Sequence, residues 1–506
     1  MKARMLMMIV ALPTLARAAD LPLPEAPVRI VIPDAAAFDA ALTGAYRNAL
    51  SGKPAESDPL ATAWRQTQVG TKLETQWSKF SSDLPWTWDE IRALKPSALG
   101  LALLNVGHLE AVLVVETPLA ALPASLPKGE TKTHEGATYH LVAVGAADES
   151  EDPERRMGLA WARREGRLFL ATSERAVKLA LDAASSGAGF PPPLPGLVSL
   201  DLDLDALRGD LYFRREFLFG EGPEKGHVRA ALRLEDGHIV EVREGMGESP
   251  SPGFVFRVAD AAAAGWEAGG EGLWPAFRAG LLEPIPVLSD RPVARVAALP
   301  VVGVAREDRY LVNLEKPRPT AGGPAGEEGD LAQWSALLGK NRVDGWGYVL
   351  GKDGGRRVVF AWPEAQDEEL VGLCRATVER RGGSVTIAQV GDTRELRVGP
   401  DLPALAFRRT GRFVWLGSSA RDLAGLPQPE PSTDVVRWGT VDLGAVRAEG
   451  ARWQKAEGPA SPERIRPLSD RILGLLGWMP KTTSLSVERR KTPTGWSERV
   501  VFGGTP

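Results

Sequence analysis

The chain of 506 residues is 43% hydrophobic and 25% charged, and it carries a net charge of −4 at neutral pH. We expect roughly two to four domains with packed cores, and the acidic balance argues against non-specific nucleic-acid binding. Cys374 is the only cysteine, which excludes an intramolecular disulfide. After the N-terminal stretch, no apolar run approaches the roughly 20 residues of a transmembrane helix, so we expect no membrane anchor.

The N-terminus has the pattern of a secretory signal peptide. Lys2 and Arg4 precede an apolar stretch over 5–15, and Ala16-Arg17-Ala18 supplies the small residues that a signal peptidase recognises. The stretch is too short to cross a bilayer of ~30 Å as a helix. We therefore predict a signal peptide over 1–18, cleavage near Ala18, and a soluble protein that is periplasmic or secreted.

The strongest signal further along the chain is a segment that occurs twice. Leu159–Ser173 reads LAWARREGRLFLATS, and Leu405–Ser419 reads LAFRRTGRFVWLGSS. Each predicts a strand, a turn with the residues Arg-Arg-x-Gly-Arg, a second strand and then a helix. Glycine at each tip permits a hairpin turn, and Ser173 and Ser419 are placed to cap the two helices.

The correspondence extends to both sides of this segment. VRIVIPDAAAF from Val28 and FVFRVADAAAA from Phe254 both predict a strand, an aspartate and an alanine-rich helix. Strand-like runs around Gly100 and Gly347 follow, and each half ends in a polar hairpin. These matches keep the same order in both halves, which indicates an internal repeat.

We therefore predict an α+β fold of two similar units in tandem, each a mostly antiparallel sheet packed with helices. The first unit spans 19–246 and the second 254–506. The Gly-, Ser- and Pro-rich stretch between them, GMGESPSPG, has the composition of a linker. A second such stretch near 317–330 predicts a flexible insertion inside the second unit.

Two helices are expected in the second unit besides those of the repeat. Residues 364–381 begin with acidic side chains and end with arginines and then glycines, as the helix dipole and a glycine stop favour. Cys374 falls on the apolar face of this helix and is interpreted as a core residue. Residues 468–478 form an amphipathic pattern whose apolar face covers the sheet or, alternatively, docks a lipid, a partner or a membrane surface.

Known catalytic and metal-binding motifs are missing from the sequence. It contains no zinc-binding spacing, no nucleophile elbow and no phosphate-binding loop, so we predict no catalytic residue, metal or cofactor. Asp203 and Asp205 are expected on one strand face, where they would bind a cation or act in a glycosidase, although a solvated face is the simpler interpretation. Loop positions are expected for the histidines, which are His108, His134, His140, His227 and His238.

The paired arginine turns are the one candidate binding feature. Exposed guanidinium groups at a hairpin tip are suited to hold a phosphate or a carboxylate. Alternatively, the arginines keep the strand edges soluble. The candidate anion-binding residues are Arg163, Arg164, Arg167, Arg408, Arg409 and Arg412.

The chain resembles the exported bacterial proteins grouped as domain of unknown function 3352. The resemblance rests on the opening strand–Asp–helix segments, the strands at Gly100 and Gly347, and the segments ending in RAVKLAL and ARDLAGL. It covers most of the mature chain in two copies. The motifs are structural, and the family implies no catalytic residue.

A duplicated architecture without a catalytic motif favours a non-enzymatic function. Our leading hypothesis is a cell-envelope protein with a binding or scaffolding role, which holds an apolar ligand on its sheets and has a lipid or an envelope protein as its partner. The alternative is a hydrolase of unfamiliar type that uses acidic residues in a cleft between the two units. A unit whose only role is protein–protein contact is a third hypothesis.

Overall fold

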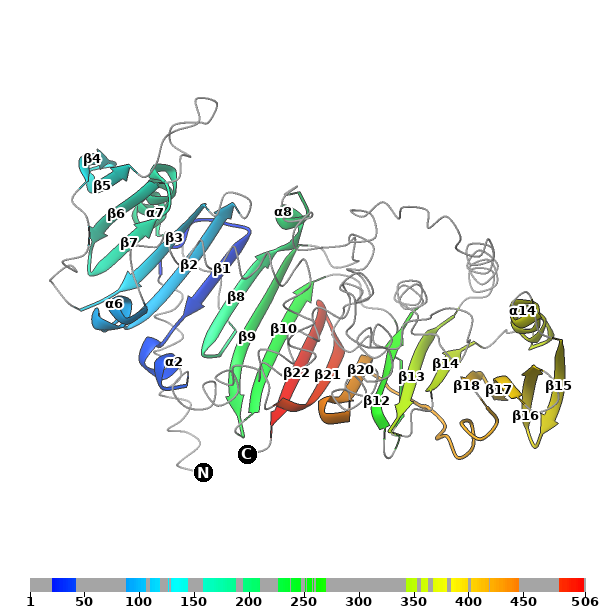
Figure 1. Cartoon of the computed structure of the whole chain (residues 1–506). Coiled ribbons are helices and arrows are strands. Elements are labelled where there is room, and N and C mark those ends of the chain that lie inside the picture. The colour runs from blue at the N-terminus through cyan, green and yellow to red at the C-terminus, as the bar shows by residue number, and fades with distance from the viewer. Residues whose placement is uncertain are drawn as a thin grey trace, which may run out of the picture. The chain divides into compact units, whose positions relative to one another are not determined.

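The computed structural model shows the arrangement of strands and helices in Figure 1. It describes residues 21–41, 88–105, 110–118, 126, 129–143, 158–187, 194–209, 226–236, 238–246, 251, 253–256, 258, 261–269, 343–352, 356–362, 367–379, 384–398, 402–417, 419–445 and 482–504. The predicted signal peptide, the insertion near 317–330, the helix at 468–478 and His108 lie outside the described residues.

The secondary structure corrects the predicted fold class. Of the described residues, 58% lie in strands and only 17% in helices, and the strands form mostly antiparallel sheet. The prediction of an α+β fold of two units, each packed with helices, is therefore wrong. The chain divides into two compact units near residue 247, and we describe each unit by itself.

The first unit consists of antiparallel strands in the order β10-β9-β8-β1-β2-β3-β7-β6-β5-β4 (Figure 1). The strands are β1 (Val28–Ile32), β2 (Ala98–Asn105), β3 (Glu110–Glu116), β4 (Glu130–His134), β5 (Ala137–Ala143), β6 (Gly158–Arg164), β7 (Arg167–Ala171), β8 (Val198–Asp203), β9 (His227–Glu235) and β10 (His238–Met246). The helices are α2 (Ala35–Ala41), α6 (Trp88–Ala93), α7 (Glu174–Ser186) and α8 (Leu204–Gly209).

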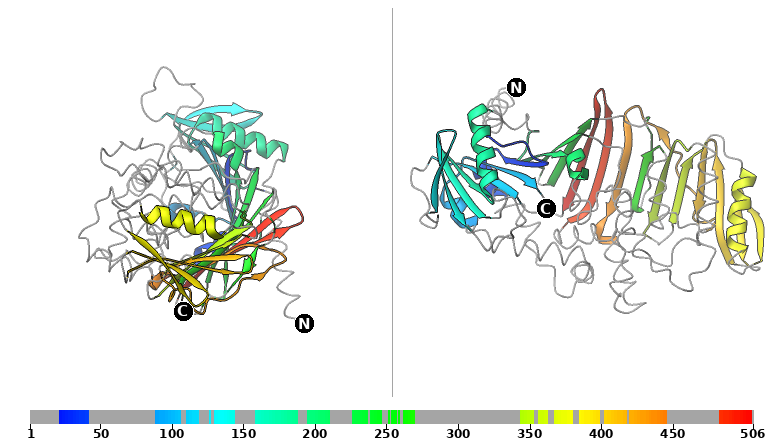
Figure 2. Two further views of the ribbon diagram at one scale, coloured as in Figure 1. Left: turned by 90° about the vertical axis from the view of Figure 1, so that its right-hand side faces the viewer. Right: turned by 90° about the horizontal axis from the view of Figure 1, so that it is seen from above.

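Helix α7 covers one face of the first unit's sheet, across β3, β5, β6 and β7 (Figure 2). The Ser173 side chain caps it by accepting from the backbone N–H of Ala176, and Gly187 ends it with a φ of 67°. Val177, Ala180 and Leu181 form an apolar stripe that is buried against the sheet. The stripe and the two caps explain why the helix begins and ends at these residues.

The second unit contains antiparallel strands in the order β22-β21-β20-β12-β13-β14-β18-β17-β16-β15. They are β12 (Ala261–Ala268), β13 (Gly345–Gly351), β14 (Arg356–Ala361), β15 (Val385–Val390), β16 (Thr393–Val398), β17 (Leu402–Thr410), β18 (Phe413–Gly417), β20 (Val435–Asp442), β21 (Thr482–Thr492) and β22 (Gly495–Gly504). The short strands β11 (Phe254–Val255) and β19 (Glu430–Pro431) pair with each other, and α14 (Asp367–Glu379) packs on β15 and β17.

The strand orders of the two units correspond position by position. In each, the first strand lies between the second strand and the strand that follows the hairpin of the repeated segment, β8 in one unit and β20 in the other. That hairpin, β6–β7 or β17–β18, pairs with β3 or β14. In each sheet, the central pairs therefore join strands that are distant in sequence, whereas the pairs at the two ends join strands that are consecutive in sequence.

Two helices predicted from the repeat are absent from the second unit. The alanine run after Phe254 forms the central strand β12, because Gly265 weakens a helix by about 1 kcal/mol while β13 and β20 supply hydrogen bonds on both sides. The segment after Ser419 forms turns that end at Gly425, which has a φ of 68°. Pro427 and Pro429 follow, and proline does not continue a helix.

Candidate functional site

One face of the second unit's sheet carries a cluster of aromatic side chains. Phe256 packs edge-to-face on Trp438 of β20, with ring centroids 4.9 Å apart, and on Trp415 of β18 at 5.7 Å. Phe254 contacts Phe413 in the same geometry at 4.8 Å. The indole N–H of Trp438 donates to the carbonyl oxygen of Phe254 at 2.9 Å. The segment before β12 is therefore held to the sheet by apolar contacts and by a hydrogen bond.

A pocket of about 490 Å³ lies beside this cluster. Its apolar wall is formed by Phe256, Val258, Ala264 and Trp438. The volume falls within the roughly 300–1,000 Å³ of typical small-molecule sites. Ala264 of β12 is nearly fully buried and contributes only a methyl group. No large side chain at this position of β12 therefore fills the pocket beside Trp438.

The other side of the pocket is polar and is lined by Thr440, Ser486, Glu488 and Arg499. Glu488 and Arg499 lie opposite each other in the β21–β22 register, so their charges balance. Arg490 donates to Glu488 at 2.7 Å and to Asp434 at 2.6 Å. The hydrogen bonds to Glu488 and Asp434 raise the pKa of Arg490, and the Arg490 guanidinium in turn lowers the pKa of Asp434. The rim is thus a row of alternating charges.

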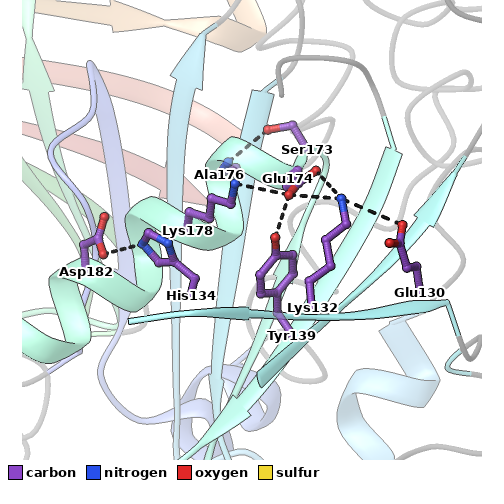
Figure 3. Close-up of polar contacts among 9 residues, drawn as sticks. All are labelled: Glu130, Lys132, His134, Tyr139, Ser173, Glu174, Ala176, Lys178 and Asp182. Carbon is purple, nitrogen blue, oxygen red and sulfur yellow. Dashed lines mark hydrogen bonds and ion pairs between the residues drawn. The ribbon is translucent and has the colours of Figure 1, made fainter. Parts of the chain in front are cut away.

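The first unit contains a second polar cluster, centred on Glu174 at the start of α7 (Figure 3). The Tyr139 hydroxyl donates to Glu174 at 2.5 Å, and the ammonium groups of Lys178 and Lys132 approach it at 3.1 and 3.2 Å. Tyr139 and Lys132 come from the hairpin β4–β5. The cluster therefore joins this hairpin to the helix.

A second contact between the same two elements lies two residues further along β4 and about two helical turns further along α7. The His134 Nε2 atom is 2.7 Å from the Asp182 carboxylate, so the end of β4 is joined to the middle of α7 (Figure 3). The Ser173 hydroxyl accepts the capping hydrogen bond from Ala176 and donates to Glu110 at 2.8 Å, so it belongs to the helix cap. The arrangement is suited to hold the hairpin on the helix rather than to perform chemistry.

The contacts of Glu174 and Tyr139 shift both pKa values. Burial opposes ionisation of Glu174, but hydrogen bonds from Tyr139, Lys178 and Lys132 outweigh it and lower the pKa of the carboxyl group. Burial, together with the hydrogen bond to Glu174, raises the pKa of Tyr139 to about 12. Near neutral pH the cluster therefore holds an ionised glutamate and a protonated tyrosine, the pair of states that forms the short hydrogen bond.

These pKa shifts predict the pH range over which the first unit is most stable. The lowered pKa of Glu174 stabilises the folded state at pH values above the pKa of the unfolded chain, near 4.5. This stabilisation is lost as the pH falls through the pKa of the folded state. The raised pKa of Tyr139 stabilises the folded state below pH 10, and this stabilisation is lost as the pH rises toward 12. Urea unfolding followed across pH should show both losses. Glu174→Gln should flatten the acid loss and Tyr139→Phe the alkaline one; unchanged profiles would contradict the assignment.

A buried ion pair lies elsewhere in the first unit's sheet. Arg29 of β1 donates to the carboxylate of Asp201 of β8 at 2.6 Å, and the two residues are 7% and 1% exposed. The Nδ1 atom of His227 lies 3.2 Å from the same carboxylate. Arg29 and Asp201 are directly opposite in register, so the pair fills the space between two neighbouring strands on that face.

The structure gathers the candidate anion-binding arginines at their two hairpins, where carboxylates already contact them. Salt bridges join Arg164 to Glu165, Arg167 to Glu116, Arg408 to Asp392, Arg409 to Asp367 and Arg412 to Asp344. Arg163 lies in β6 of the same hairpin and also has an interaction partner. Anion binding at these turns stays a prediction, and an anion would have to compete with these acids.

Other residues that the sequence singled out have structural contacts. Asp203 ends β8 and accepts from the backbone N–H groups of Asp205 and Ala206, so it caps α8 instead of sharing a strand face with Asp205. His134 and His140 lie in β4 and β5, and His227 and His238 are the first residues of β9 and β10, which corrects the loop prediction for these four histidines. His140 stacks on Trp161 with centroids 4.0 Å apart. These contacts explain the residues without a ligand.

The pocket was not predicted from the sequence. Its residues come from β12, β20, β21, β22 and the segment before β12, and no short motif links positions so far apart. The alternation of Phe254 and Phe256 and the pair Trp438-Gly439 are the only local signals. Such a pattern predicts buried strands and does not distinguish a filled core from a pocket.

Comparison with models of known protein families found no match, and comparison with curated proteins found none either. Within the described ranges, no group of three or more His, Cys, Asp or Glu side chains is placed to hold a metal ion. None of the helices in the part of the chain that the structure describes is long and apolar enough to cross a membrane. The resemblance to the domain of unknown function 3352 stays a prediction.

Proposed function

We propose that the protein is a non-enzymatic binding protein of the cell envelope and that it holds an apolar ligand in the pocket of the second unit. The observation that carries the proposal is the pocket itself. Its volume suits a small molecule, and aromatic rings meet a polar rim across it. Ligand sites combine an apolar wall with a few polar groups that orient the ligand, and this pocket has both.

The side chains around the pocket support binding rather than catalysis. Ser486 and Thr440 are the hydroxyl-bearing residues among the described lining residues, and no histidine or lysine of the described lining is present to activate them. Glu488 is the one carboxylate among the lining residues that the structure describes, and it accepts a hydrogen bond from Arg490.

Export is part of the same proposal. A basic start, a short apolar stretch and Ala16-Arg17-Ala18 support cleavage near Ala18 and a periplasmic or secreted location, and a lipid or an envelope protein is the proposed partner. N-terminal sequencing of the protein recovered from the exported fraction of its own cells tests this. A first residue near Ala19 supports export, and an intact Met1 in the cell interior refutes it.

Binding is tested with the neutral fluorescent probe N-phenyl-1-naphthylamine, which gains fluorescence in apolar sites. The full chain should give a saturable titration. Thr440→Phe, at an exposed strand position of the rim, should fill the pocket and lower the affinity for the probe at least about tenfold. The matched control is Ser484→Phe, which adds the same ring at another exposed position on the same face of β21 but outside the pocket lining. Absence of saturable binding, or equal affinity in both variants, would refute the proposed site.

A further inference from the structure

The two units differ at the position of the pocket. Val31 of β1 lies opposite Gly100, and Trp266 of β12 lies opposite Gly347. In both sheets the glycine leaves room for a large side chain: Leu23 is 3.0 Å from the position of a β-carbon at Gly100, and Trp266 is 2.9 Å from that at Gly347. These glycines therefore give a common reference for aligning β1 with β12.

Two residues before this reference, the first unit has Arg29 and the second has Ala264. Arg29 lies opposite Asp201, and Ala264 lies opposite Thr440. One unit thus fills the position with a buried ion pair, whereas the other places a methyl group and a hydroxyl group there. Ala264 and Thr440 are both lining residues of the pocket. The second unit therefore lacks the buried ion pair at a position where side chains of its own line the pocket.

From this difference we infer that the second unit alone binds the ligand and that the ligand is an uncharged amphiphile, with a ring-containing apolar body and a hydrogen-bonding end. The inference rests on the proposed function and adds to it the ligand class and the stoichiometry. In the first unit, Arg29 and Asp201 occupy the corresponding positions and satisfy each other's charge.

The chemistry of the walls selects the ligand class. The rings of Trp438 and Phe256 favour a flat, ring-containing body, because aromatic faces and edges attract one another. At the opposite side, Thr440 and Ser486 offer hydroxyl groups that both donate and accept hydrogen bonds. Glu488 and Arg499 lie opposite each other, so the rim has no excess charge that would favour an anion or a cation.

The stoichiometry is tested by transferring the ion pair into the second unit. The double variant Ala264→Arg/Thr440→Asp reproduces in the pocket the pair that fills the first unit. Wild-type chain should bind one N-phenyl-1-naphthylamine molecule, and the double variant should bind it at least about tenfold more weakly with an unchanged circular dichroism spectrum. Should the double variant not fold, the number of probe molecules bound by wild-type chain decides: one supports the inference and two refute it.

The ligand class is tested with a charged probe of similar size. Anilinonaphthalene sulfonate shares the ring system of the neutral probe but carries a negative charge. The neutral probe should bind wild-type chain at least about tenfold more tightly, and equal or tighter binding of the anion would refute the uncharged class. No saturable binding of the neutral probe would refute the proposed function. Saturable binding at two sites would refute only the inference drawn here, whereas undiminished binding by a folded double variant would also refute the proposed site.

Discussion

Replacing Arg29 by alanine is expected to destabilise the first unit by about 3–5 kcal/mol. The change removes the guanidinium that neutralises Asp201, whose side chain is only 1% exposed, and leaves a charge in the sheet interior. His227 is half exposed and contacts the same carboxylate, so it compensates only in part. Urea unfolding followed by circular dichroism measures the loss of unfolding free energy.

Two controls separate the effect of leaving the buried Asp201 charge unpaired from the effect of losing the arginine side chain. Arg229 pairs with Glu244 where both side chains are about 40% exposed, and Arg229→Ala should cost at most about 1 kcal/mol. Arg29→Met combined with Asp201→Leu removes both charges and should cost less than Arg29→Ala alone. Equal losses of unfolding free energy for Arg29→Ala and Arg229→Ala would show that burial does not determine how strongly the Arg29–Asp201 ion pair stabilises the unit.

Replacing Trp266 by alanine is expected to destabilise the second unit by about 3–5 kcal/mol. The indole is 1% exposed and packs edge-to-face on Phe254 at 5.4 Å and on Phe256 and Phe413 at 6.4 Å. Its loss leaves a cavity in the aromatic cluster that holds the segment before β12. The free energy of unfolding should fall accordingly in denaturant titrations, with a smaller loss for Trp266→Phe.

The glycine next to this indole provides an internal check. A β-carbon at Gly253 would lie 2.5 Å from the indole nitrogen of Trp266, so Gly253→Ala should cost about 1–3 kcal/mol through overpacking. In the Trp266→Ala background that clash is gone, and the same substitution should cost much less. Additive effects of the two substitutions would show that the indole does not set the space at Gly253.

The local elements of the fold could be predicted from the sequence because neighbouring residues determine them. Ser173 and Gly187 bound α7, and an acidic start marks α14 within the predicted range 364–381. Glycines mark the two hairpin turns, with φ values of 75° at Gly166 and 59° at Gly411, and Glu165 beside Gly166 has a φ of 50° as well. Each of these features depends on hydrogen bonds and charges within a few residues.

The errors arose where partners distant in sequence decide the conformation. The alanine run of β12 has high helix propensity, but hydrogen bonds to β13 and β20 on both sides outweigh the preference. The segment after Ser419 resembles α7 in sequence, yet Gly425 ends it after a few residues. A sequence window contains neither the neighbouring strands nor their register, which is why helix content was overestimated.

The sequence by itself determined the hairpins, the caps and charges of the longer helices, and the repeated order of segments, because these depend on short-range contacts. Only the tertiary structure decided what fills each sheet face. Arg29 and Asp201 are 172 positions apart, and Ala264 lies opposite Thr440 through the same kind of long-range register. Whether a position holds an ion pair or a pocket depends on both partners, and strand pairing alone brings them together.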